Sequence, residues 1–167
     1  MRNVKEIYCN CLSLVNEAGI TDVGFIQSVT VNNRLKKTWG RTSTRGDGVY
    51  QIEIAGLLMG DDVPMETVNN TMIHELLHTC KGCMNHGPEW KRRAEIVKAK
   101  LGYDIQRCVG VEENKRMSDK LIQQAKYAFR CKGCGVVVTK DRMTRFVKHP
   151  SWYRCAKCGG SFEEVKK

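Results

Sequence analysis

The stretch His74-Glu75-Leu76-Leu77-His78, followed by His86-Gly87-Pro88-Glu89-Trp90, decides the fold expected of this chain. Three of its four histidines fall between positions 74 and 86. On a helix, side chains at positions i and i+4 share a face about one turn apart, so His74 and His78 can reach one metal ion. If the loop folds back, His86 completes a site of three imidazoles with a fourth position open for water, as catalytic zinc requires. The sequence therefore predicts that His74, His78 and His86 bind zinc.

Glu75 points away from the face that carries the two histidines, by about 100° around the helix. It need not bind the metal, and it can instead take the proton of a water at the open position. The opposite side of the same helix is an apolar stripe made of Met65, Val68, Met72 and Leu76. This pattern predicts a helix from about Pro64 to His78, with Glu75 as a general base.

The residues around this helix predict a small α+β domain. Apolar residues recur at helical spacing from Asn3 to Ala18 and again from Pro88 to Leu101. Between the first of these helices and Pro64, short runs rich in β-branched and aromatic residues predict a three-stranded β-meander, over Ile26–Val31, Lys36–Thr42 and Val49–Ile54. We expect an exposed strand edge near Val49–Ile54, where an extended substrate could pair.

Four cysteines near the C-terminus have the spacing of a structural zinc site. Cys131 and Cys134 are separated by two residues, as are Cys155 and Cys158. Four thiolates fill the coordination shell, so this second zinc is expected to hold the fold and to do no chemistry. A redox dithiol pair is the alternative, but it would need a βαβ context that the sequence lacks. We expect Val136–Thr139 and Phe146–Lys148 to form strands of this ribbon.

The chain is expected to have three parts. Residues 1–110 form the metal-binding domain, residues 111–129 a helical connector, and residues 130–167 the four-cysteine zinc ribbon. The connector is predicted to be helical from Ser118, with an inner face of Leu121, Ile122, Ala125 and Phe129.

Positive charge is concentrated in the second part of the chain. Residues 1–110 carry 14 basic and 12 acidic side chains, whereas residues 111–167 carry 14 and 6. Aromatic residues are interleaved with the charges, at Phe146, Trp152 and Tyr153. Basic side chains can bind the phosphates of a nucleic-acid backbone, and aromatic rings can stack on its bases. We therefore expect the ribbon to bind single-stranded or distorted DNA. Alternatively, the aromatic residues form the core of the ribbon and the charges keep it soluble.

Membrane insertion and export are not expected. The longest apolar run, Ile54–Met59, is far shorter than the roughly 20 residues of a membrane span. The N-terminus has an amphipathic pattern, and nine cysteines is an odd number, which argues against a disulfide framework. We expect a cytoplasmic protein, associated with the nucleoid or located in a nucleus.

Cys80 and Cys83 form a further pair between His78 and His86. They could compete for the catalytic metal, form a reversible disulfide that shapes the His86 loop, or pack as small apolar side chains. Packing or loop shaping is favoured, because two cysteines and two histidines would close the zinc site.

In combination, the His74-to-His78 motif, the His86-Gly87-Pro88-Glu89-Trp90 loop and the C-terminal cysteine ribbon resemble the SprT-like zinc metallopeptidase family. The resemblance implies a zincin-like fold in which His74, His78 and His86 bind zinc and Glu75 is the catalytic base. It also implies cleavage of proteins that are bound or crosslinked to DNA. A DNA-binding protein with an idle zincin scaffold and a zinc hydrolase of another amide are the alternatives.

Overall fold

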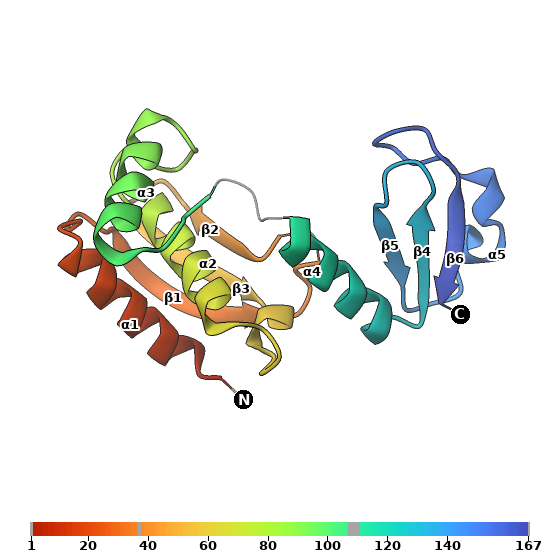
Figure 1. The fold of residues 1–167 in the computed structure, drawn as a ribbon, viewed down its shortest axis with the longest axis horizontal. Coiled ribbons are helices and arrows are strands. Elements are labelled where there is room, and N and C mark those ends of the chain that lie inside the picture. The colour runs from red at the N-terminus through yellow and green to blue at the C-terminus, as the bar shows by residue number, and fades with distance from the viewer. Residues whose placement is uncertain (1, 37, 107–110, 167) are drawn as a thin grey trace. The chain divides into compact units, whose positions relative to one another are not determined.

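The computed structural model describes residues 2–36, 38–106 and 111–166 of the chain. The chain divides into two compact units, Met1–Cys108 and Val109–Lys167, each with helices and its own three-stranded sheet (Figure 1). The predicted α+β fold class is thereby confirmed. The expected boundary at residue 110 lies outside the described residues.

Three helices of the first unit form where the sequence predicts them: α1 (Val4–Glu17), α2 (Met65–His78) and α3 (Pro88–Leu101). Each has a local reason to begin or end there. The Asn3 side chain accepts a hydrogen bond from the backbone N–H of Lys5 and so caps α1. Gly102 ends α3 with φ +76°, a left-handed conformation that glycine adopts without strain.

The sheet of the first unit contains β1 (Phe25–Asn32), β2 (Gly40–Thr44) and β3 (Val49–Ala55) in the order β1-β3-β2. The predicted meander is wrong, because β3 lies in the middle, parallel to β1 and antiparallel to β2. A short turn joins β2 to β3, whereas the seven residues from 33 to 39 let the chain cross from β1 to the far edge. In this central position β3 is the most buried of the three strands.

Because β3 is the central strand, the predicted exposed edge near Val49–Ile54 is also wrong. Val49–Ile54 pairs with a strand on each side and offers no free edge. The expected strand over Lys36–Thr42 is shifted as well, because β2 begins only at Gly40. The edge strand that contacts α2 is β2.

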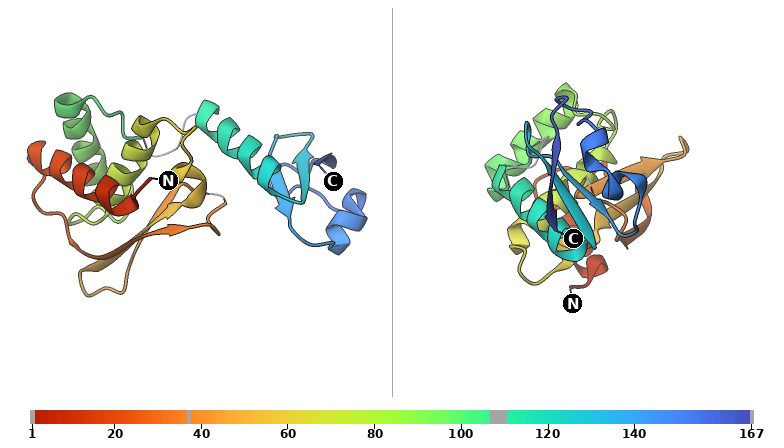
Figure 2. Two further views of the ribbon diagram at one scale, coloured as in Figure 1. Left: turned by 90° about the horizontal axis from the view of Figure 1, so that it is seen from below. Right: turned by 90° about the vertical axis from the view of Figure 1, so that its right-hand side faces the viewer.

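The helices of the first unit lie on one face of its sheet (Figure 2). α1 contacts β1, α2 contacts β2 and β3, and α3 packs against α2. A short 3-10 helix, η1 (Gly56–Met59), follows β3. The core between these layers contains the largest fully buried side chains of the unit: Trp90, Ile52, Ile54, Leu58, Met72, Ile73, Leu76, Leu77, Val15, Val68 and Val97. Met65 is an exception to the predicted apolar stripe of α2, since it is exposed.

The second unit contains α4 (Val111–Gln124), β4 (Tyr127–Cys131), β5 (Val137–Lys140), α5 (Arg145–Lys148), the 3-10 helix η2 (Pro150–Trp152) and β6 (Phe162–Lys166). Its strand order is β5-β4-β6, with both pairs antiparallel. α4 begins seven residues before Ser118, and Phe129 lies in β4 instead of on the connector helix. The expected strand at Phe146–Lys148 is the short helix α5, which Thr144 caps.

Aromatic packing accounts for two of these differences, the place of Phe129 in β4 and the helix α5. Phe129 is fully buried in β4, and its ring meets the ring of Phe146 edge-on at 4.8 Å between centroids. Phe146 also contacts Tyr153 and Phe162 in the same manner. A turn of helix directs Phe146 into this cluster. In the part of the chain that the structure describes, every helix is too short or too polar to cross a bilayer.

Candidate functional site

The three predicted zinc ligands converge in the first unit. His74 and His78 lie one turn apart on α2, and His86 comes from the loop that leads into α3. The Nε2 atom of His74 lies 3.1 Å from Nε2 of His78 and 3.0 Å from Nε2 of His86. The ligand atoms of the three side chains all lie within 4.8 Å of one another.

Backbone carbonyls orient two of these imidazoles. Nδ1 of His74 lies 3.0 Å from the carbonyl oxygen of Gln106, and Nδ1 of His78 lies 2.7 Å from that of Cys83. A carbonyl can only accept, so both Nδ1 atoms donate. In the neutral rings the proton therefore sits on Nδ1, and the Nε2 lone pairs of His74 and His78 face each other.

This arrangement fits a zinc ion. Burial lowers the pKa of His74 to about 4, with a further contribution from the neighbouring histidines, and burial also lowers the pKa of His78. Neutral His74 and His78 then present Nε2 lone pairs to each other at 3.1 Å, a repulsive contact without a cation. In a tetrahedral site with Zn–N bonds of about 2.0–2.1 Å, neighbouring nitrogens lie roughly 3.3 Å apart. The donor set is therefore close to the spacing that zinc requires.

Trp90 of α3 packs against all three imidazoles. Its ring centroid lies 4.9 Å from that of His74, 5.8 Å from that of His78 and 4.6 Å from that of His86. The indole is only 2% exposed, and its N–H has no hydrogen-bond partner among the described residues. Apolar packing therefore holds the ring against the histidines, where it limits their movement and excludes water from one side of the site.

Glu75 is buried between α2 and β2. Burial raises the pKa of its carboxyl to about 7, although the hydroxyl of Thr42 works in the opposite direction. That hydroxyl oxygen lies 2.8 Å from Oε2 of Glu75 and 2.9 Å from its backbone oxygen. A carboxyl whose pKa is close to neutral pH can both accept and release a proton, as a general base must.

Cys80 and Cys83 lie outside the histidine cluster. Both are buried, and the described sulfur and nitrogen atoms that could hold a metal do not group them with the histidines. Burial raises the pKa of the Cys80 thiol to about 12 and also raises that of Cys83. Both are free thiols, which supports the alternative in which the pair packs as small apolar side chains, since a thiol that stays protonated is a poor ligand and a poor nucleophile.

An ion-pair network contacts the loop that carries Cys80 and Cys83. Arg93 of α3 is buried and pairs with Asp22 and Glu89. Its charge also interacts with the thiols of Cys80 and Cys83. The loop between the second and third histidines is therefore tied to α3 and to the segment that precedes β1.

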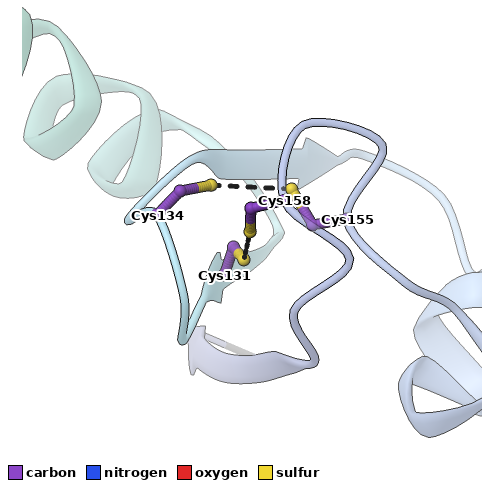
Figure 3. Close-up of side chains that lie close together, drawn as sticks. All are labelled: Cys131, Cys134, Cys155 and Cys158. Carbon is purple, nitrogen blue, oxygen red and sulfur yellow. Dashed lines mark hydrogen bonds between the residues drawn. The ribbon is translucent and has the colours of Figure 1, made fainter.

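The four cysteines of the second unit form the other candidate metal centre (Figure 3). Sγ of Cys131 lies 3.4 Å from Sγ of Cys158, and Sγ of Cys134 lies 3.6 Å from Sγ of Cys155. With Zn–S bonds of about 2.3 Å, a tetrahedral site places its sulfurs roughly 3.8 Å apart. Backbone N–H donors of Cys134 and Gly133 lower the pKa of Cys131 to about 6, which favours the thiolate that binds metal.

Two glycines of this centre provide space near its sulfur atoms. A Cβ atom on Gly133 would lie 3.0 Å from Sγ of Cys158, and one on Gly160 would lie 3.0 Å from Sγ of Cys131. Gly135 and Gly159 instead adopt positive φ, at +72° and +73°. The backbone thus turns tightly around the cluster, and its N–H groups approach the sulfurs closely enough to donate to them.

The model of the SprT-like family matches residues 11–124, more than half of the chain. The chain belongs to the SprT-like family. This confirms the resemblance seen in the sequence and identifies a zincin-like, metalloprotease-type domain in the first unit. A comparison with curated proteins finds no match. The cysteine cluster lies beyond the matched residues, but its geometry is consistent with the expected zinc ribbon.

Sequence reasoning missed several residues that shape the SprT-like site. Neither Thr42 nor Gly40 was singled out, and the carbonyls of Cys83 and Gln106 carry no side-chain signal at all. The sequence shows Trp90 only as the last residue of the His86-Gly87-Pro88-Glu89-Trp90 motif. Its position beneath the three imidazoles depends on how α3 packs on α2, which no local pattern shows.

The aromatic residues of the basic ribbon separate into two groups. Phe146 and Tyr153 belong to the aromatic core of the unit. Trp152 is 67% exposed, and its ring stacks on that of His149 at 4.1 Å and 11°. Of the three aromatic residues first considered for base stacking, only Trp152 is thus largely open to a partner. Basic residues of the same segment are Lys140, Arg142, Arg145, Lys148 and Arg154.

Proposed function

We propose that this SprT-like protein is a zinc-dependent peptidase in which His74, His78 and His86 hold the metal and Glu75 is the general base. The observation that carries the proposal is that three Nε2 atoms, two from α2 and one from the loop that follows it, converge at one point. The buried carboxyl of Glu75 lies on the residue directly after His74 in the same helix. Zinc at this position would polarise the scissile carbonyl and acidify a water molecule.

The protein side chains would then perform the proton transfers. Glu75 accepts a proton from the attacking water and delivers it to the amine that leaves. Burial raises the pKa of this carboxyl to about 7 in the metal-free protein, and a zinc ion beside it would favour the ionised form that accepts the proton. The carbonyls of Cys83 and Gln106 keep Nε2 of His78 and His74 directed at the metal position throughout.

An extended substrate would pair with β2. This strand lies at one edge of its sheet and contacts α2, so a peptide added beside it would pass close to Glu75. Main-chain hydrogen bonds would supply most of the affinity in this mode and little sequence specificity. A peptidase of this kind needs another way to select its substrates.

We propose that DNA provides this selection. Between Lys115 and Lys157 there are twelve basic residues and only two acidic ones, Asp119 and Asp141. Phosphate contacts from these residues, and stacking of an unpaired base on Trp152, would hold the ribbon on single-stranded or distorted DNA. The substrates would be proteins bound or crosslinked to that DNA, in a nucleoid or nucleus.

Cleavage of a histone by the purified protein, with and without single-stranded DNA, tests the proposal. Zinc-loaded wild-type protein should cleave the histone faster when DNA is present, and Glu75→Gln should retain its zinc but lose turnover. DNA binding without cleavage under either condition would instead indicate an idle zincin scaffold. Cleavage of small amides that does not respond to DNA would indicate a zinc hydrolase of another substrate.

DNA-binding measurements at increasing salt concentration test the contribution of the ribbon. If the basic residues contact phosphates, the logarithm of the binding constant should fall steeply and linearly with the logarithm of the salt concentration. Trp152→Ala should weaken binding to single strands more than binding to duplex, because only unpaired bases can stack on the indole. Equal losses on both forms of DNA would contradict a stacking role.

A further inference from the structure

The inner face of β2 is shaped around the side chain of Glu75. Gly40 and Thr42 are two residues apart on this strand and therefore point to the same face. Both lie against the one carboxyl: the Thr42 hydroxyl oxygen is 2.8 Å from Oε2, and a Cβ on Gly40 would be 2.6 Å from Oε1. Thr42 thus contacts one oxygen of the proposed base, and the missing side chain of Gly40 leaves room for the other.

The hydroxyl of Thr42 has chemistry that suits this position. It has one hydrogen to donate but lies within hydrogen-bond distance of two oxygens of Glu75, Oε2 and the backbone carbonyl oxygen. When the carboxylate is ionised, Thr42 can donate to Oε2. When the carboxyl carries a proton, the carboxyl can donate to Thr42, and Thr42 can donate to the carbonyl. A hydroxyl therefore holds the side chain in either state, which a donor-only or acceptor-only group cannot do.

Gly40 provides the space that the carboxyl occupies. A Cβ at this position would also lie 2.7 Å from Cγ and 2.9 Å from Cδ of Glu75, distances that no real methyl group tolerates. Glycine has no side chain, so the backbone of β2 can approach the carboxyl closely. Any other residue would force the carboxyl to move.

We propose that Thr42 and Gly40 are positioning residues that fix the Glu75 carboxyl for proton transfer, without binding metal or substrate themselves. This inference rests on the proposed peptidase function and adds two residues of the edge strand to its machinery. The strand that we expect to receive the substrate would then also set the orientation of the base, so one element would align both.

Three threonine variants test the hydrogen bond. Thr42→Val keeps the shape and removes the hydroxyl, and its kcat for histone cleavage should fall about 10- to 100-fold with little change in KM. Thr42→Ser restores the hydroxyl and should recover kcat to within about threefold of wild type. Thr30→Val makes the same exchange at an exposed position of β1, at the opposite edge of the sheet, and should retain the wild-type kcat.

A glycine variant, zinc analysis and crystal structures distinguish a positioning role from a general loss of structure. Gly40→Ala should lower kcat while zinc content remains that of wild type, because the metal ligands are on other elements. Crystal structures of metal-free Gly40→Ala and Thr42→Val should show the Glu75 carboxyl displaced, with the imidazoles unmoved. Reduced zinc content in Thr42→Val would mean a structural role and would overturn the inference.

The outcomes also distinguish this inference from the proposed function. If the wild-type protein does not cleave histone at all, the peptidase proposal fails. If it cleaves and Thr42→Val retains the wild-type kcat, or Thr42→Ser is as slow as Thr42→Val, the peptidase proposal stands and the positioning role of Thr42 is refuted.

Discussion

Replacing Glu75 by glutamine should change the pH dependence of stability in the metal-free protein as well as abolish turnover. The carboxyl is 6% exposed, and burial raises its pKa from 4.5 to about 7. Because the folded state binds this proton more tightly than the unfolded state, folding is favoured below pH 4.5 and progressively less favoured as the pH rises to 7. Glutamine has nearly the same shape and no such proton.

The size of the effect follows from the same pKa. Each pKa unit corresponds to about 1.4 kcal/mol, so a rise from 4.5 to about 7 amounts to about 3 kcal/mol of unfolding free energy. The difference in stability between Glu75→Gln and wild type should therefore shift by about 3 kcal/mol in favour of the variant between pH 4 and pH 8. The pKa of His74 is lowered, so this side chain destabilises the fold on acidification, but it does so equally in both proteins.

Urea unfolding in the presence of a chelator measures this shift. Trp39 and Trp90 are buried in the first unit, so the fluorescence change on unfolding reports mainly on that unit, whereas Trp152 is already exposed. Glu66→Gln is the matched control, because Glu66 lies on the same helix but is exposed. If the unfolding free energies of Glu75→Gln and wild type change with pH in parallel from pH 4 to pH 8, the reasoning is refuted. An equal change in the unfolding free energy of Glu66→Gln relative to wild type would refute it as well.

Three further predictions concern the metal centres and the ribbon. Cys131→Ser should lower the zinc content from two ions to one per chain and unfold the second unit alone, as measured by metal analysis and hydrogen exchange. Phe129→Ala should destabilise the second unit by about 3–5 kcal/mol, whereas Trp152→Ala should change its stability by less than about 0.5 kcal/mol in thermal unfolding, because only Phe129 is buried. Burial lowers the pKa of His74 to about 4, so protons should compete with zinc for this ligand less than they do for an exposed imidazole, and release well above pH 6 during a metal-retention titration would contradict the burial of the site.

The helices of the first unit and the grouping of both candidate ligand sets could be predicted because most of their signals are local. A helix brings residues four apart onto one face, so the positions of His74 and His78 follow from their spacing. The two cysteine pairs are similar, since each knuckle is a short turn of a few residues. Gly102 ends α3 by its own conformational freedom, without help from the rest of the fold.

The strand order could not be predicted in the same way. The hydrophobic pattern identified three strands in the first unit, but pairing depends on which strand buries the most surface once the helices are in place. β3 took the centre, so the edge that is available to a substrate moved to β2. In the second unit, the need to bury Phe146 against Phe129 turned an expected strand into a helix.

The sequence by itself determined which side chains can bind metal and where positive charge accumulates, because both depend on residue type and on short, regular spacing. Only the tertiary structure decided how these side chains are oriented and supported. Trp90, the carbonyls of Cys83 and Gln106, and the hydroxyl of Thr42 act on the site from other segments of the chain. Such contacts arise when helices and strands pack, and packing depends on the whole core at once.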